Sequence, residues 1–133
     1  MRCSFFISFT FYWLHLYIMN AETLRTFASS LEMVTEGFPF DETTLVFKAN
    51  GKMFLLVSLD SVPLVISVKG KPEDNVELRE EFPESCSGAY HMNKIHWNSI
   101  IIDGRISETR IQELISISHQ LVFKMPKKTR YHL

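Results

Sequence analysis

Hydrophobic positions from residue 19 onward follow helical and strand spacings in turn. The first helical pattern begins behind Asn20, a residue type that favours the N-cap because its side chain accepts hydrogen bonds from free backbone amides. The pattern predicts a helix of about twelve residues whose apolar stripe faces a sheet. That stripe consists of Leu24, Phe27, Ala28 and Leu31.

Apolar stretches separated by turn residues predict a run of strands after this helix. The expected strands cover residues 35–40, 44–49, 52–57 and 64–68. Pro39 closes the first of them, and Asp41-Glu42 marks a turn. The clearest signal is Asn50-Gly51 between the second and third strands, because this pair supplies the two positive φ angles of a type I′ hairpin turn.

A second helix and a last strand follow. Pro72 suits the first turn of a helix, where a missing N–H is tolerated, and Pro83 ends this short acidic helix. We interpret residues 85–88 as a flexible loop. Residues 97–102 form an apolar strand that Asp103-Gly104 terminates.

The chain closes with a third helix, which Ser107 is placed to cap. Its buried face consists of Ile111, Leu114, Ile115, Ser118 and Val122. The order of elements is a helix, several strands, a helix, a strand and a helix. This order predicts an α+β fold in which helices pack on an antiparallel sheet.

Length and composition indicate a single domain. The chain has 133 residues, of which 46% are hydrophobic and 22% charged, as in an ordinary globular protein with one core. We expect an apolar extension outside the fold at residues 1–18, a domain at residues 19–125 and a basic tail at residues 126–133.

Residues 1–18 are almost wholly apolar and aromatic, with Arg2 as their only fixed charge. They are fewer than the roughly 20 residues that span a bilayer, and no small-x-small cleavage site precedes Met19. We expect translation to begin at Met19, which makes the leader an upstream-start artefact or a dispensable extension. Membrane association through this segment is the alternative.

Charge and cysteine usage exclude several classes of protein. The formal net charge of -1, from 14 basic and 15 acidic residues, gives no whole-molecule attraction to nucleic acid, so such binding requires a local basic patch. Cys3 and Cys86 are the only thiols. Neither a disulfide framework nor a cysteine-based zinc site is therefore indicated, and we expect a cytoplasmic protein.

The densest polar chemistry lies in residues 90–97, Tyr-His-Met-Asn-Lys-Ile-His-Trp. One interpretation is a phosphate-facing loop in which Lys94 supplies charge and His91 and Asn93 donate hydrogen bonds. Trp97 or Tyr90 then offers a stacking surface. The alternative is that the aromatic residues belong to the core and the polar ones satisfy buried backbone groups.

A series of short motifs occurs in order between residues 19 and 130. They are Phe38-Pro39-Phe40-Asp41-Glu42, Phe47-Lys48 with Gly51-Lys52-Met53-Phe54, Val68-Lys69 with Pro72-Glu73, Tyr90-His91-Met92-Asn93-Lys94 with His96-Trp97, and Leu121-Val122 near Lys127-Lys128. This series resembles the MmcQ/YjbR family of small bacterial proteins. The resemblance implies a double-wing-like fold and a DNA-binding or regulatory role without catalytic activity.

The chain departs from the family pattern at two places. Ser87-Gly88-Ala89 stands where the family commonly has a proline, and Ser118-His119 stands where many members carry Ser-Tyr. These departures affect the expected detail of one loop and of the last helix, and they leave the expected fold unchanged.

We expect DNA to contact a set of basic, polar and aromatic residues. Lys48 and Lys52 flank the hairpin tip, where a protruding wing reaches a phosphate backbone. The whole expected set is Lys48, Lys52, Lys69, His91, Asn93, Lys94, His96, Trp97, Lys127 and Lys128. The basic run at residues 124–130 either holds phosphates or only keeps the protein soluble.

Metal and catalytic sites are weaker hypotheses. His91, His96 and His119 are conceivable ligands for zinc or iron, but no carboxylate or thiol stands beside them at a recognised spacing. Cys86 lies near His91 in the sequence, yet nucleophilic catalysis also needs an orienting third group. We therefore expect no metal, no cofactor and no enzymatic activity.

A module that binds a protein partner or a small ligand is the competing function. Helices on one side of an antiparallel sheet leave its other face available for binding. We expect that face to carry Phe47, Phe54, Leu56 and Val65 in part.

Overall fold

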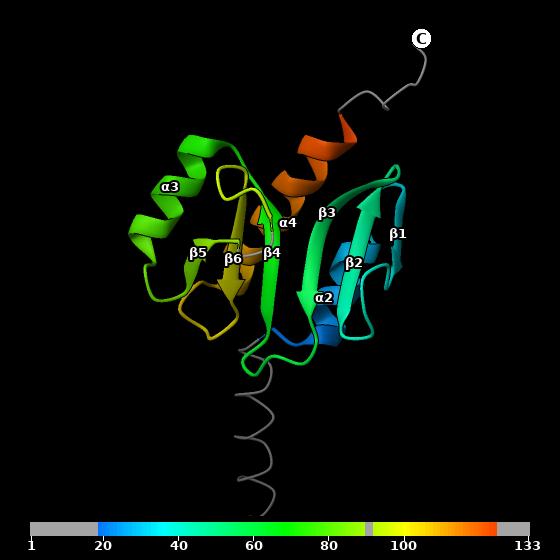
Figure 1. Cartoon of the computed structure of the whole chain (residues 1–133), viewed down its shortest axis with the longest axis horizontal. Helices are drawn as coiled ribbons and strands as arrows, with labels where there is room; N and C mark the ends of the chain where they lie inside the picture. Colours follow the sequence, from blue (N-terminus) through cyan, green and yellow to red (C-terminus); the bar gives the residue numbers. More distant parts are fainter. Residues whose placement is uncertain (1–18, 90–91, 125–133) are drawn as a thin grey trace, which may run out of the picture.

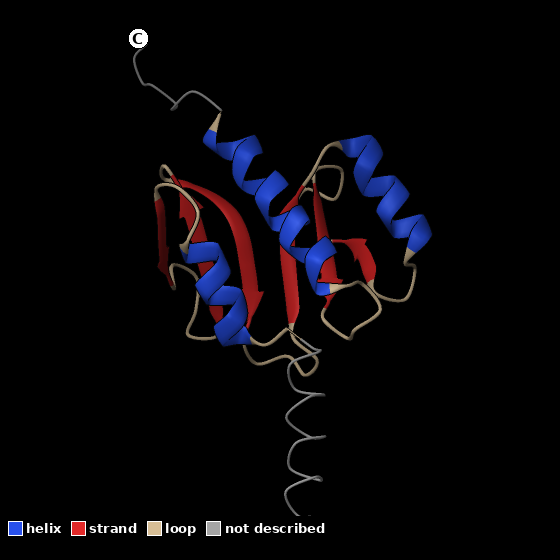
Figure 2. Ribbon diagram, turned by 180° about the vertical axis from the view of Figure 1, so that it is seen from behind, coloured by secondary structure: helices blue, strands red, loops and turns tan. Residues whose placement is uncertain are grey.

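In the described part of the chain, six antiparallel strands form a single sheet, and three helices lie on one of its faces (Figures 1 and 2). The structure is a computed structural model that describes residues 19–89 and 92–124. Within these ranges the strand order across the sheet is β1-β2-β3-β4-β6-β5. The predicted α+β fold with an antiparallel sheet is confirmed.

The elements lie close to their predicted positions. Their bounds are α2 (Ala21–Ser29), β1 (Val34–Gly37), β2 (Thr44–Ala49), β3 (Lys52–Ser58), β4 (Val65–Lys69), α3 (Pro72–Glu81), β5 (Cys86–Gly88), β6 (Trp97–Ile101) and α4 (Glu108–Phe123). The predicted extension at residues 1–18 and the tail at residues 126–133 lie outside the described residues. No helix in the two described ranges has the length and hydropathy of a bilayer span.

Local sequence signals account for several boundaries. The side chain of Asn20 accepts a hydrogen bond from the Thr23 amide at 2.8 Å, and the Ser107 hydroxyl accepts one from the Arg110 amide at 3.2 Å. Both predicted N-caps are therefore confirmed. Asn50 and Gly51 have φ angles of 52° and 83°, which fit the predicted type I′ turn.

The core lies between the sheet and the helices that cross it (Figure 2). Cross-strand partners share a face of a sheet, and the register pairs Phe47 with Leu55 and Val57 with Ile66. These four side chains are fully buried, together with Leu24 of α2 and Ile115 of α4. The helix-covered face is thus the dry face of the sheet.

The expectation that Phe47 and Phe54 lie on the free face is wrong, because both are fully buried in the helix-covered core. A bulge between Phe47 and Lys48 shifts the register, which puts Phe54 in the core beside its neighbour Leu55. The opposite face is here called the open face. Its strand positions include Thr35, Val46, Lys48, Leu56, Val65, Ser67, Lys69, Ser99 and Ile101.

The interpretation of residues 85–88 as a flexible loop is also wrong. Cys86–Gly88 forms the edge strand β5, which pairs with β6 through Cys86 opposite Ile100 and Gly88 opposite Asn98. Three residues are too few for an alternating pattern to be recognised. These residues form a strand because they pair with β6, which is distant in sequence.

The hydroxyl of Ser118 joins two strands that separate at one end. The ladder between β3 and β4 stops at Leu55 opposite Val68, and Figure 1 shows β3 bending away from β4 beyond this point. There the buried Ser118 hydroxyl accepts a hydrogen bond from the Lys69 amide at 2.9 Å and donates one to the Phe54 carbonyl at 2.5 Å. A side chain of α4 thereby takes the place of a backbone hydrogen bond between β3 and β4.

We expect Ser118→Ala to lower the free energy of unfolding by about 1–3 kcal/mol, because it leaves two buried backbone groups unpaired. Ser116→Ala, on the same helix but outside the core, is the matched control and should change stability by less than about 0.5 kcal/mol. Denaturant unfolding of both variants measures the difference. Equal effects would contradict a bridging role for the Ser118 hydroxyl.

Candidate nucleic-acid interface

All six lysines of the described residues lie at one end of the sheet. Lys48 and Lys52 flank the β2–β3 hairpin turn, and Lys69 ends β4 opposite Trp97, the first residue of β6. Because neighbouring strands are antiparallel, the end of β4 and the start of β6 lie beside that hairpin turn. This group is called the basic end, and it consists of Lys48, Lys52, Lys69, Lys71, Lys94 and Lys124.

Helix α4 brings Lys124 to the same end. The buried His119 ring donates a hydrogen bond from Nε2 to the Glu32 carbonyl at 2.8 Å. Glu32 precedes Val34, which pairs with Ala49 next to the hairpin turn. The rings of Phe54 and Phe123 pack against the His119 ring, and each centroid lies 5.2 Å from that of His119. The last turn of α4 is therefore fixed beside the hairpin (Figure 1).

Acidic residues dominate the opposite end of the sheet. The connections there contain Asp41, Glu42, Asp60, Glu84 and Asp103, with Arg105 as the basic exception. Backbone amides of Thr43 and Thr44 donate to the Asp41 carboxylate and hold its pKa below the usual range. At the basic end the acidic residues are Glu32, Glu73 and Asp74. The near-neutral net charge therefore conceals a strong separation of charge along the strands.

The open face continues the positive charge onto the sheet. Lys48 and Lys69 project from strand positions on this face, and no carboxylate occupies a strand position on it in the described residues. Trp97 lies opposite Lys69 but is only 7% exposed, which leaves little ring surface for stacking on a base. Trp97 is therefore a buried residue of the open face, outside the hydrophobic cluster between the sheet and the helices.

The segment before β6 presents three predicted residues differently. Asn93 is exposed, but its side chain accepts a hydrogen bond from the Ile95 amide at 2.9 Å, which shapes the turn. Lys94 is exposed, and its aliphatic stem covers Gly88 on the helix-covered side. His96 is also exposed, and its carbonyl accepts a hydrogen bond from the Gly70 amide at 2.9 Å. These residues border the open face rather than lying on it.

A buried polar network anchors this segment to α3. Asn98 is fully buried, accepts a hydrogen bond from Arg79 Nε at 2.7 Å and donates to the Asn75 carbonyl at 3.2 Å. Asn75 in turn donates to the Ile95 carbonyl at 3.1 Å, and Arg79 donates to that of Lys94. Since each polar group finds a partner, the network fixes where Lys94 is presented.

Sequence reasoning missed this network. The pattern of the short acidic helix before Pro83 predicts no buried polar side chain, whereas Arg79 of this helix reaches inward to Asn98. Asn75 and Arg79 are four residues apart, which places both side chains on one face of α3. That spacing was the available signal, although nothing local identifies the buried acceptor.

Tyr90, His91, Lys127 and Lys128 lie outside the described residues. No group of three metal-ligating side chains occurs in the described ranges, where His119 is bound to Glu32 and His96 is exposed. Cys86 is buried, and desolvation raises the pKa of its thiol to about 11 despite the nearby Arg79. A thiol of this kind is a poor nucleophile at neutral pH.

The chain is similar to several known proteins. A sequence model of the family described as YjbR matches residues 29–121. The chain is 38% identical over 102 residues to the uncharacterized protein YbdF of Escherichia coli O157:H7, which covers 76% of this chain and 82% of YbdF. It is 27% identical over 84 residues to the uncharacterized protein YjbR of Escherichia coli strain K12. This match covers 62% of this chain and 70% of YjbR.

A solved structure shows the same fold. The crystal structure of Deinococcus radiodurans protein DR2400, a DUF419 domain, superposes with a TM-score of 0.79 at 35% sequence identity. The match covers 83% of this chain and 84% of that chain. The arrangement of helices and sheet described above is therefore shared over most of both proteins.

We expect Gly70→Ala to release the segment before β6, because a Cβ on Gly70 would lie 2.3 Å from Asn75 Oδ1. The clash displaces the Asn75 side chain and should destabilise the protein by about 1–3 kcal/mol. Amide hydrogen exchange at residues 93–97 should become faster. Gly37→Ala, where no atom lies within 4 Å of the added Cβ, is the control. Unchanged exchange in Gly70→Ala would contradict the anchoring role of the network.

We expect Cys86 to resist thiol reagents at pH 8 in the folded protein, measured in a Cys3→Ser background. The raised pKa keeps the thiol protonated, and burial blocks access. Because its pKa is raised, the Cys86 thiol is favoured in its protonated form in the folded protein. The stability that this protonated thiol contributes is therefore lost as pH rises through about 11. Rapid labelling in native buffer, at the rate of the unfolded chain, would contradict this description.

Proposed function

The chain belongs to the YjbR family, and from this premise we propose that it is a DNA-binding or regulatory module without catalytic activity. Its basic end contacts the phosphate backbone. The observation that carries the proposal is the gathering of all six described lysines at one end of the sheet, while acidic connections occupy the other. This distribution supports a local patch in a chain of net charge -1.

Phosphate contact suits the chemistry of these residues. Lysine ammonium groups neutralise phosphates and release counterions, which supplies affinity that does not depend on sequence. Lys52 stands beside the hairpin tip and Lys94 on the anchored segment, so the charges come from separate connections on one side of the molecule. Lys127 and Lys128 extend the proposed patch along the chain beyond Lys124.

Base reading contributes less than phosphate contact in this proposal. The Asn93 side chain already accepts a hydrogen bond within its own turn, and Trp97 has little exposed ring surface. In the described part of the segment, His96 is the exposed ring that is left to contact a base. We therefore expect binding that is weakly dependent on DNA sequence.

A protein partner is the second candidate, and exposed apolar residues beside edge strand β1 favour it. Met33, Phe38 and Phe40 are 62%, 50% and 61% exposed, and they flank a strand whose outer edge has no neighbour in the described sheet. Exposed strand edges and apolar side chains are features of association surfaces. Sedimentation velocity over a range of protein concentrations tests self-association directly.

Fluorescence anisotropy with mixed-sequence duplex DNA tests the primary proposal. We expect binding that weakens steeply with salt, and each of Lys52→Gln and Lys94→Gln should lower the slope of log affinity against log salt by about 1. Deletion of residues 125–133 should lower this slope further.

Arg105→Gln is the matched control, because it removes one positive charge from the acidic end. This variant should bind as the unchanged protein does. The proposal fails if folded protein shows no binding at low salt, or if Arg105→Gln weakens binding as much as Lys94→Gln.

A further inference from the structure

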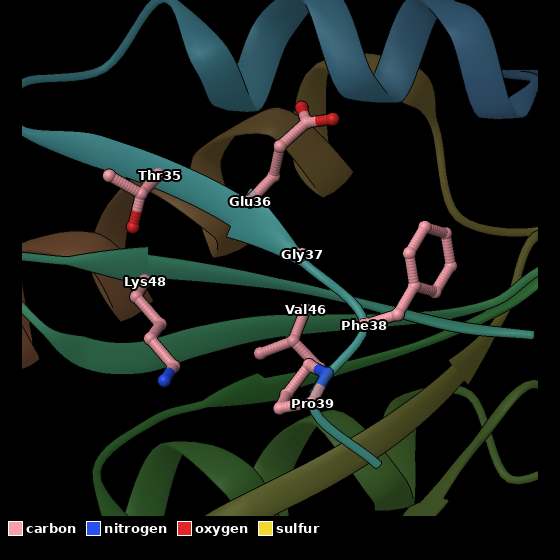
Figure 3. Close-up of a pocket in the computed structure, with 7 residues that line it drawn as sticks. All are labelled: Thr35, Glu36, Gly37, Phe38, Pro39, Val46 and Lys48. Atoms are coloured by element: carbon pink, nitrogen blue, oxygen red, sulfur yellow. The ribbon is translucent and has the colours of Figure 1, made fainter. Parts of the chain in front are cut away.

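A groove on the open face lies between β1 and the residues that follow it (Figure 3). Its volume is about 310 Å³, and its lining includes Thr35, Gly37, Phe38, Pro39, Val46 and Lys48. Pockets for small molecules span roughly 300–1,000 Å³. The groove is thus large enough for a ligand of about one ring.

The lining combines an apolar wall with one cation. Val46 and Pro39 lie together in the groove, and Lys48 projects beside them (Figure 3). Thr35 is paired directly opposite Lys48 and adds a hydroxyl group. A ligand that fits this lining has an apolar body and a group that accepts hydrogen bonds from an ammonium and a hydroxyl.

The charge of Lys48 is not neutralised within the described residues. Its ammonium makes no hydrogen bond or ion pair there, although the side chain is half-buried. Glu36 is the acidic residue of the lining, but its carboxylate points away from the groove (Figure 3) and binds Arg25 at 2.8 Å. A partly desolvated cation favours an anionic partner, so the groove is complementary to an anion.

Gly37 keeps the groove open. It pairs with Val46, so a side chain at this position would project onto the open face where the groove lies. No atom lies within 4 Å of the place that its Cβ would take. The space is therefore present in the folded chain before any ligand arrives, and an added Cβ at this position would meet no neighbour.

We propose that this groove binds a small organic carboxylate with an apolar body. The carboxylate pairs with the Lys48 ammonium and the Thr35 hydroxyl, and the body lies on the exposed ring of Pro39, which borders the buried Val46. The binding does not rest on the proposed function, because it involves a free acid and no nucleic acid. Failure of one proposal therefore leaves the other standing.

Titration of the ¹⁵N-labelled full chain with benzoate tests the proposal. Saturable amide shifts should appear at Thr35, Gly37 and Lys48, with a dissociation constant in the millimolar range that suits a one-ring ligand. Benzyl alcohol, the neutral analogue of similar size, should bind at least about tenfold more weakly because it cannot pair with the ammonium.

Three variants test whether benzoate binds in the groove through the Lys48 ammonium. Lys48→Met keeps the stem and removes the charge, and it should weaken benzoate binding about tenfold. Gly37→Val should abolish binding by filling the space, whereas Lys52→Met, outside the groove, should leave it unchanged. The proposal is overturned if Lys48→Met or Gly37→Val binds like the unchanged protein, if benzyl alcohol binds as tightly as benzoate, or if benzoate gives no saturable shift. If Lys48→Met does not fold, the binding of benzoate to Gly37→Val and the binding of benzyl alcohol to the unchanged protein test the proposal.

Discussion

The Ser118 hydroxyl holds together the two halves of the sheet at its basic end. On one side stands the β1–β2–β3 half with Lys48 and Lys52, and on the other stands the β4–β6–β5 half with Lys69. Their ladder ends at Leu55 and Val68, and the hydrogen bonds of Ser118 to Lys69 and Phe54 continue the connection through α4. Because the lysines of the proposed interface come from both halves, their relative placement depends on this buried bridge. The proposed interface accordingly depends on core packing as well as on surface residues.

Antiparallel pairing explains how a chain of net charge -1 separates its charges. Successive connections alternate between the two ends of such a sheet, so the basic turn after β2 and the basic end of β4 come together. The acidic connections after β1, β3 and β6 collect at the other end. The Asn75, Arg79 and Asn98 network then adds Lys94 to the basic end by fixing the segment before β6. Local electrostatic attraction to phosphates is compatible with a neutral total in this arrangement.

Features that depend on neighbouring residues could be predicted from the sequence, and features that depend on distant contacts could not. The N-caps at Asn20 and Ser107 and the Asn50-Gly51 turn follow from local backbone chemistry, and the structure contains all three. Edge strand β5 and the inward turn of Arg79 each require a partner far along the chain. The bulge lies within the β2–β3 hairpin, but the burial of Phe54 depends on α4, where its ring contacts His119. Met33 adopts a φ of 58°, which its residue type does not indicate. For the candidate site, Lys48, Lys52, Lys69 and Lys94 were recognisable from the motifs. Lys71 was not predicted, and the gathering of the lysines at one end required the strand order.

In the proposed function, the basic end forms one continuous surface for phosphate. Mapping of amide chemical shifts on the ¹⁵N-labelled chain during titration with a short DNA duplex tests it most directly, since the shifts locate the surface without any substitution. We expect shifts that cluster at residues 50–52, 69–71 and 92–96, with residues 41–43, 59–61 and 103–105 unchanged. Shifts centred on the acidic connections, or folded protein whose spectrum does not respond to DNA at low salt, would contradict it.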